Sequence, residues 1–164
     1  MNRYGVSKIE VLIIALIVGL LGVMAVVAVS TARSRTRDAI RLSDVRQVQA
    51  GLELAFNNSN TYPEAADAIP LGEGNARCLS TDEFTSSCVS TDQVYLEIVP
   101  ATPTDGLTGL GVCQTSKNAY CYKGAASGYR IEFEMENENP ILGLQKGLNC
   151  ASESGIDAGA CSAL

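Results

Sequence analysis

An uninterrupted apolar run lies near the N-terminus of the chain. Residues 11–29 contain no charged and no hydroxyl, amide or other polar side chain. As an α-helix this run is about 28 Å long, close to the roughly 30 Å thickness of the hydrocarbon layer of a bilayer. A secretory signal peptide is the alternative, because Ala28, Val29 and Ser30 would suit a signal peptidase, but such peptides have apolar cores of only about 7 to 15 residues. The run therefore predicts a membrane-spanning helix.

The polar sequence that follows keeps a helical periodicity. Apolar residues recur at intervals of three and four, namely Ala39, Leu42, Val45, Val48, Leu52, Ala55 and Phe56. Such a stripe predicts one buried helix face, and no helix breaker other than Gly51 appears before Pro63. Residues 7–58 are therefore expected to form one helix about 78 Å long, whose first half projects from a head. Gly19 and Gly22 weaken that half by up to about 1 kcal/mol each relative to alanine, but they do not force a break.

The clearest strand pattern lies in residues 119–136. Two segments, 119–123 and 129–136, flank a Gly-Ala-Ala-Ser-Gly turn, and the second alternates apolar with charged side chains. This alternation predicts an antiparallel hairpin with one face toward the helix and the other in solvent. The apolar face holds Tyr129, Ile131, Phe133 and Met135, and the expected solvated face holds Arg130, Glu132, Glu134 and Glu136.

The rest of the chain carries weaker signals. Residues 64–118, and the polar, glycine-rich tail from Asn137, predict loops rather than further strands. The fold class is therefore expected to be α+β, a long N-terminal helix packed on a small antiparallel β-sheet, with the apolar first half of the helix protruding. The expected parts are a leader at 1–5, an apolar helix at 6–30, an amphipathic continuation of the same helix at 31–60 and a globular, disulfide-bonded head at 61–164.

Charge is divided unevenly along the chain. Residues 1–46 carry 7 Lys/Arg against 3 Asp/Glu, whereas residues 47–164 carry 5 against 15. Nucleic-acid binders normally present a basic face, so an acidic head argues against nucleic acid as a partner. The chain contains no histidine, no phosphate-binding loop and no nucleophile elbow, so neither a Ser-His nor a Cys-His pair is available and we expect no catalytic residue and no enzyme activity.

Six cysteines follow the apolar run, and an even number in a head of this size is typical of disulfides in an oxidising compartment. A zinc site is the alternative. However, the successive pairs are separated by 10, 8 and 11 residues, without a Cys-x-x-Cys motif, and no histidine is present. Six cysteines allow about 15 connectivities. Nearest-neighbour pairing is the simplest of them and would join Cys78 to Cys88, Cys113 to Cys121 and Cys150 to Cys161.

The N-terminal third resembles the type IV pilin and pseudopilin family. The polar leader MNRY precedes Gly5, Glu10 is the fifth residue after that glycine, and the run GVSKIEVLIIALIVGLLG follows in the family's register. Residues 35–63, RTRDAIRLSDVRQVQAGLELAFNNSNTYP, resemble the second half of the family's N-terminal helix, and YLEIVPATPTDG (95–106) resembles its link into the sheet. The sequence is therefore identified as a member of the prepilin class by resemblance.

The resemblance implies how the precursor is processed and assembled. A prepilin peptidase would cut between Gly5 and Val6, and the new amine of Val6 would be N-methylated. A carboxylate toward the bilayer centre costs about 2.5–3.5 kcal/mol, so Glu10 would gain from pairing with the Val6 amine of a neighbouring subunit. Glu10 is then the assembly residue.

The function implied is that of a structural subunit of a type IV pilus or pilus-like filament, polymerised through its N-terminal helix. The expected partners are identical or related pilin subunits, the prepilin peptidase and an inner-membrane assembly platform. The protein would lie in the inner membrane before assembly and then in an extracellular or periplasmic filament, with its head outside the cytoplasm. The alternatives are a pseudopilin of a type II secretion or DNA-uptake system and a single-pass anchored ectodomain that never polymerises.

Two further expectations concern charged residues. Arg33, Arg37 and Arg41 share one helix face. They are expected to meet lipid headgroups, which the sequence slightly favours, or acidic groups of a neighbouring head, with Glu132, Glu134 and Glu136 as the candidates. No cofactor and no metal is expected. Calcium is the weaker alternative, suggested by the alternating glutamates and by Asp157, because hard cations need six to eight converging oxygens.

Overall fold

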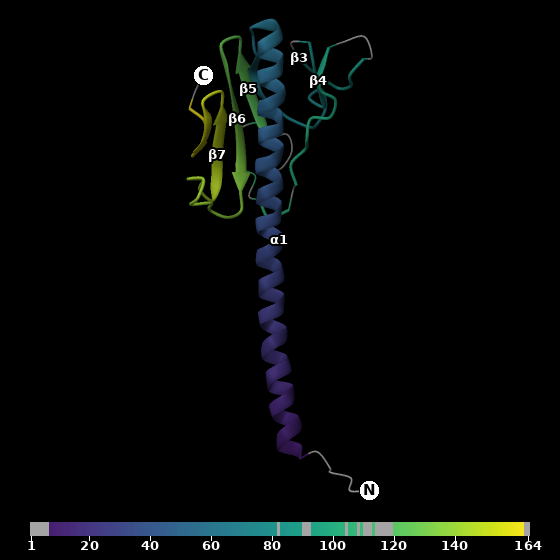
Figure 1. Cartoon of the computed structure of the whole chain (residues 1–164), viewed down its shortest axis with the longest axis vertical. Helices are drawn as coiled ribbons and strands as arrows, with labels where there is room; N and C mark the ends of the chain where they lie inside the picture. Colours follow the sequence, from purple (N-terminus) through teal and green to yellow (C-terminus); the bar gives the residue numbers. More distant parts are fainter. Residues whose placement is uncertain are drawn as a thin grey trace.

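A computed structural model of the chain describes residues 7–81, 83–89, 93–103, 105–107, 109, 113 and 120–162. Its first element is one long helix, α1 (Lys8–Ser59), and all of its strands follow that helix. The strands are β1 (Ala65–Pro70), β2 (Cys78–Ser80), β3 (Glu83–Thr85), β4 (Val94–Leu96), β5 (Cys121–Ala125), β6 (Gly128–Met135), β7 (Gly147–Ser152) and β8 (Gly155–Ala158). Figure 1 shows the first half of α1 projecting from a head that is built around its second half.

Helix α1 confirms the expected single helix to within one or two residues at each end. It begins after Ser7, whose backbone is extended, and it continues through Gly19 and Gly22 without a break. It ends at Asn60, which takes the left-handed conformation (φ 59°) and donates its backbone N–H to Phe56 O at 2.7 Å. Asparagine tolerates this conformation better than most residues, so the Asn-rich sequence there ends the helix.

The buried face of α1 differs from the expected stripe at its lower end. Val45, Val48 and Leu52 are buried as predicted, but Ala39 is exposed. The face begins instead with Asp38 and Arg41, two charged residues that are buried against the head.

The main sheet has five antiparallel strands in the order β1-β5-β6-β7-β8. Strand β6 is central, and the hairpin that it forms with β5 is confirmed, with Tyr122 opposite Ile131 and Gly124 opposite Tyr129. One face of β6 packs on the buried stripe of α1 in a single apolar core. This is the α+β arrangement that the sequence predicts, a helix covering one face of an antiparallel sheet.

The expectation of loops in residues 64–118 and after Asn137 is wrong in part. A second sheet of three strands, β3-β2-β4, lies beside the end of α1, where Leu96 comes close to Gly51. The tail forms β7 and β8, which extend the main sheet. Strands of three to six residues are too short to display a clear alternation, and β7 and β8 are rich in small and polar residues, so their pairing depends on neighbours rather than on local pattern.

Candidate membrane anchor and charged neck

The apolar half of α1 is uncovered. Among the described residues, α1 is the one helix long and apolar enough to cross a membrane, and none of its most apolar stretch is buried against the head. Its large apolar side chains from Ile9 to Val29 are between 49% (Ile17) and 70% (Val26) exposed. Monomeric soluble proteins rarely expose continuous apolar surfaces larger than a few hundred Å². This half of the helix therefore requires a covering, which lipid or other protein chains can supply.

The continuity of α1 bears on the signal-peptide alternative. The possible cleavage site at residues 28–30 lies inside the helix, where Ser30 Oγ donates a hydrogen bond to Val27 O at 2.9 Å. The same helix continues to Ser59 and supplies part of the apolar core of the head. A retained helix therefore fits this geometry better than a removed one.

Glu10, the expected assembly residue, lies in the first turn of α1. Its backbone N–H donates to Ser7 O at 3.0 Å and its side chain is exposed. The partial positive charge at a helix N-terminus favours a carboxylate in this turn. Gly5 and Val6, the expected cleavage site and new amine, lie outside the described residues. Pairing between Glu10 and the Val6 amine of a neighbour therefore stays a prediction.

A group of charged residues joins α1 to the base of the head. We call this group the charged neck, and it consists of Arg37, Asp38 and Arg41 on α1 with Glu136 and Asn137 after β6. Arg37 donates two hydrogen bonds to Glu136, from Nε to Oε1 at 2.7 Å and from Nη2 to Oε2 at 2.6 Å. Planar guanidinium and carboxylate groups match in this two-bond geometry, which fixes orientation as well as distance.

Arg41 is the buried centre of the neck, with none of its surface exposed. Its Nη1 donates to Asp38 Oδ1 and to Glu136 Oε1, both at 2.8 Å. Its Nη2 donates to two backbone carbonyls, Pro103 O at 3.1 Å and Asp105 O at 2.7 Å. A buried cation is tolerated when it is paired and hydrogen-bonded, and both terminal nitrogens of Arg41 meet these conditions, whereas its buried Nε has no hydrogen-bond partner among the described residues. Arg41 thereby holds Pro103 and Asp105, which lie between β4 and β5 in the chain, against the helix.

Asp38 completes the neck by accepting backbone hydrogen bonds. It receives the N–H of Glu136 at 2.8 Å and the N–H of Asn137 at 2.9 Å, and the Asn137 side-chain amide also donates to it at 2.9 Å. The chain that leaves β6 is thus fixed to α1 through its main chain. Two positive and two negative side chains balance one another, so the neck carries no net charge.

Contacts within the neck shift the pKa values of Glu136 and Arg37. Hydrogen bonds from Arg37 hold the pKa of the Glu136 carboxyl below its ordinary value, although partial burial opposes the shift. The same bonds raise the pKa of the Arg37 guanidinium. Both shifts favour the charged forms, so the pair is ionised over the physiological pH range.

The structure corrects the expectation that Arg37 and Arg41 meet lipid headgroups or a neighbour's glutamates. Both bind Glu136 of their own chain. Of the three arginines on that face, Arg33 is exposed and forms no ion pair with any described residue. The physical reason is that Glu136 follows the last residue of β6 and lies at the level where the base of the sheet meets α1.

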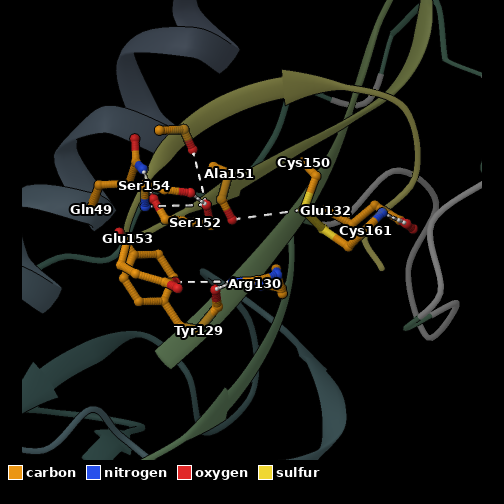
Figure 2. The surroundings of a disulfide bond; sticks show 11 residues. Gln49, Tyr129, Arg130, Glu132, Cys150, Ala151, Ser152, Glu153, Ser154 and Cys161 are labelled. Atoms are coloured by element: carbon orange, nitrogen blue, oxygen red, sulfur yellow. Dashed lines mark hydrogen bonds and ion pairs between the residues drawn. A yellow bond between two sulfur atoms is a disulfide. The ribbon is translucent and has the colours of Figure 1, made fainter. Parts of the chain in front are cut away.

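The glutamates of β6 are not a solvated face, which is a second correction. Glu132 is 2% exposed and Glu134 is 6% exposed. Glu132 lies between the disulfide-bonded Cys121 and Cys150 in strand register, and Figure 2 shows it beside the Cys150–Cys161 bond. Its Oε2 accepts the N–H of Cys161 at 3.2 Å, and Glu134 Oε2 accepts the N–H of Gly109 at 3.3 Å. Disulfide-linked segments therefore cover the face that the sequence assigns to solvent.

The cysteines form three disulfides, and no described cysteine is free. The pairs are those of the nearest-neighbour pattern, Cys78–Cys88, Cys113–Cys121 and Cys150–Cys161. Cross-links of this kind limit the freedom of the unfolded chain and typically stabilise a fold by about 2–4 kcal/mol each. The last of them holds the C-terminal segment against β7.

The described residues contain no cluster of three or more acidic or sulfur ligands that could hold a metal ion. Asp157, named above for calcium, is exposed on β8 opposite Cys150. Calcium binding stays an untested alternative.

Comparison of the chain with protein-family models, with curated proteins and with solved structures found no match. The candidate functional residues are therefore identified from the sequence and structure of this chain alone. The charged neck was not predicted from the sequence. The available signals were the spacing of three residues between Asp38 and Arg41 and the position of Glu136 at the end of a strand.

Proposed function

We propose that the protein is a structural subunit of a type IV pilus or pilus-like filament, anchored in a membrane by α1 before assembly and polymerised through the same helix. The observation that carries this proposal is the division of α1. One unbroken helix of 52 residues supplies core residues to the head with its second half and leaves the apolar first half without any covering.

This division suits a protein that exchanges one apolar environment for another. In a bilayer the exposed half of α1 is covered by lipid tails, because its length matches the hydrocarbon layer. In a filament the same surface is covered by the equivalent helices of neighbouring copies. The change requires no unfolding of the head, since the core lies on the other half of the helix.

The carboxylate of Glu10 supports polymerisation rather than anchoring alone. A simple anchor gains nothing from an acid directly at the start of its apolar run, because ionised groups are costly within a bilayer. In a helical assembly the acid can accept the amine of an adjacent copy, and both charges are then neutralised. Removal of residues 1–5 would create that amine at Val6.

The state of the N-terminus tests the proposal. The intact mass of protein from sheared cell-surface filaments, with sequencing of its first residues, should show a chain that begins at Val6 and carries one methyl group. The same analysis of the membrane fraction should show this mature form as well. A chain that keeps Met1, or one that begins near Ser30, would overturn the proposal. The first would indicate an anchored ectodomain that does not polymerise, and the second would indicate a secreted protein.

A further inference from the structure

The base of the head ends in an exposed apolar turn. Asn139 and Leu144 pair with each other through two backbone hydrogen bonds, of 2.8 Å and 3.0 Å, and Leu144 is buried. Ile141 lies near the apex of this turn with 93% of its surface exposed, and the neighbouring Leu142 is 42% exposed. An isoleucine so fully exposed on a tight, hydrogen-bonded turn gains nothing from the fold of its own chain.

The turn is held at a defined level along α1. The side-chain amide of Asn137 donates to Ser34 Oγ at 3.1 Å, and Ile141 lines one groove together with Arg35 and Leu42. Figure 1 shows this segment, coloured yellow-green, at the end of the head nearest the protruding half of the helix. The turn therefore faces whatever surface surrounds that half.

Helix geometry places this level close to lipid headgroups. The nearest helix residue that shares a groove with the turn is Arg35, six residues beyond the apolar run, and Leu42, which shares grooves with both Ile141 and Leu142, is 13 residues beyond it, so the turn stands about 9 to 20 Å above the run. Each headgroup layer of a bilayer is about 5 to 8 Å thick. Membrane helices tilt by about 20° on average, which lowers one side of the head base into that layer.

The charges at this level fit an anionic surface. Arg33 and Arg35 are exposed and form no ion pair with any described residue, whereas Arg37 is bound to Glu136. Exposed basic side chains next to a bilayer are attracted to anionic lipids. Glu138, also exposed beside the turn, opposes this attraction.

We propose that the turn at Pro140–Leu142, together with Arg33 and Arg35, docks the base of the head onto an anionic phospholipid surface in the unassembled subunit. The apolar apex enters the headgroup layer while the two arginines contact phosphates. This proposal rests on the membrane-anchor part of the proposed function and does not depend on polymerisation.

Tryptophan fluorescence can test the docking, because the chain contains no tryptophan. Three single-tryptophan variants of the full chain are needed, each reconstituted as one copy per nanodisc with brominated lipid, which quenches tryptophan only at close range. Ile141→Trp reports on the base of the head and Val18→Trp reports on the span. Leu54→Trp is the matched control, because Leu54 is 56% exposed on α1 but about 30 Å further from the bilayer than Ser34.

In a bilayer containing phosphatidylglycerol, Ile141→Trp should be quenched strongly, Val18→Trp more strongly and Leu54→Trp hardly at all. Replacing Arg33 and Arg35 by glutamine in the Ile141→Trp chain should lower the docked-to-undocked ratio by about fivefold for each arginine. The equivalent change at Arg46, about 16 Å above Arg35, should have little effect.

Three results would overturn the docking. If Val18→Trp is quenched while Ile141→Trp behaves like Leu54→Trp, the anchor stands but the head base does not touch lipid. If Val18→Trp is not quenched either, the membrane span itself fails, and the docking fails with it. If the Ile141→Trp emission shifts to the blue only when two or more copies share a nanodisc, the turn binds a second copy of this chain rather than lipid.

Discussion

Replacing Arg41 by methionine should destabilise the head more than the loss of any other arginine on α1. The change keeps an unbranched side chain of similar length but removes the buried cation that contacts Asp38, Glu136 and the carbonyls of Pro103 and Asp105. Removing one partner from a buried ionic group typically costs about 3–5 kcal/mol, because the remaining groups stay buried without their counter-charge. For domains of about 60 to 250 residues, 1 kcal/mol shifts the melting temperature by about 2–8 °C, so the loss should be about 6 °C or more.

The assay is thermal unfolding of the full chain in detergent micelles with disulfides intact, followed by the near-ultraviolet circular dichroism of the head tyrosines. This signal reports on the head, whereas the detergent-bound half of α1 is expected to remain helical. Arg35→Met is the matched control, because Arg35 is exposed on the same helix and forms no ion pair with any described residue. Such surface changes usually stay within about 0.5 kcal/mol. If Arg41→Met and Arg35→Met unfold within about 1 kcal/mol of each other, the neck does not stabilise the head and the reasoning is wrong.

Three further predictions follow from individual residues. Hydrogen bonds from Arg37 lower the pKa of Glu136. Their contribution to the free energy of unfolding is therefore fully present above the ordinary carboxyl pKa and is lost as pH falls through the lowered pKa. In Glu136→Gln the free energy of unfolding should fall less steeply as the pH is lowered. Glu10→Ala should leave membrane insertion and processing intact but reduce filament yield in a shearing assay, and normal filaments would refute the ion pair. Gly51→Ala should destabilise the head in the same unfolding assay, because a Cβ there collides with the Leu96 side chain and overpacking typically costs about 1–3 kcal/mol, more than the gain in helix propensity.

The long helix and the central hairpin could be predicted because their patterns are local. A run without polar residues, a stripe at intervals of three and four, and the Asn-rich end at residues 57–60 fix the extent of α1 within one chain segment. Strand β6 is long enough for its alternation to show. By contrast, β2, β3 and β4 have three residues each, and their strand conformation depends on partners that are distant in sequence.

The burial of Glu132 and Glu134 shows where the alternation rule fails. The rule assumes that one face of a sheet is solvated, and it identified the face that packs on α1 correctly. It could not show that the disulfide-linked segments cover the other face. Cys121 and Cys150 lie on the two strands beside β6, and their disulfides bring Cys113 and Cys161 to this face from other parts of the chain. Backbone N–H groups of Cys161 and Gly109 then supply hydrogen bonds that water would otherwise give.

The charged neck also limits how the apolar half of α1 can be covered. Arg37 binds Glu136 with two bonds, and Asp38 accepts the backbone of the residues that follow β6, so the base of the head is attached to the helix at several points. A head attached in this way cannot fold back over residues 11–29, because that movement would break the buried bonds of Arg41 as well. Nor is Glu136 available to a neighbouring copy while the neck is intact. The covering of the apolar half must therefore come from outside the chain. On the head side of the span, the first exposed basic side chains that the neck leaves available to a neighbouring copy are Arg33 and Arg35.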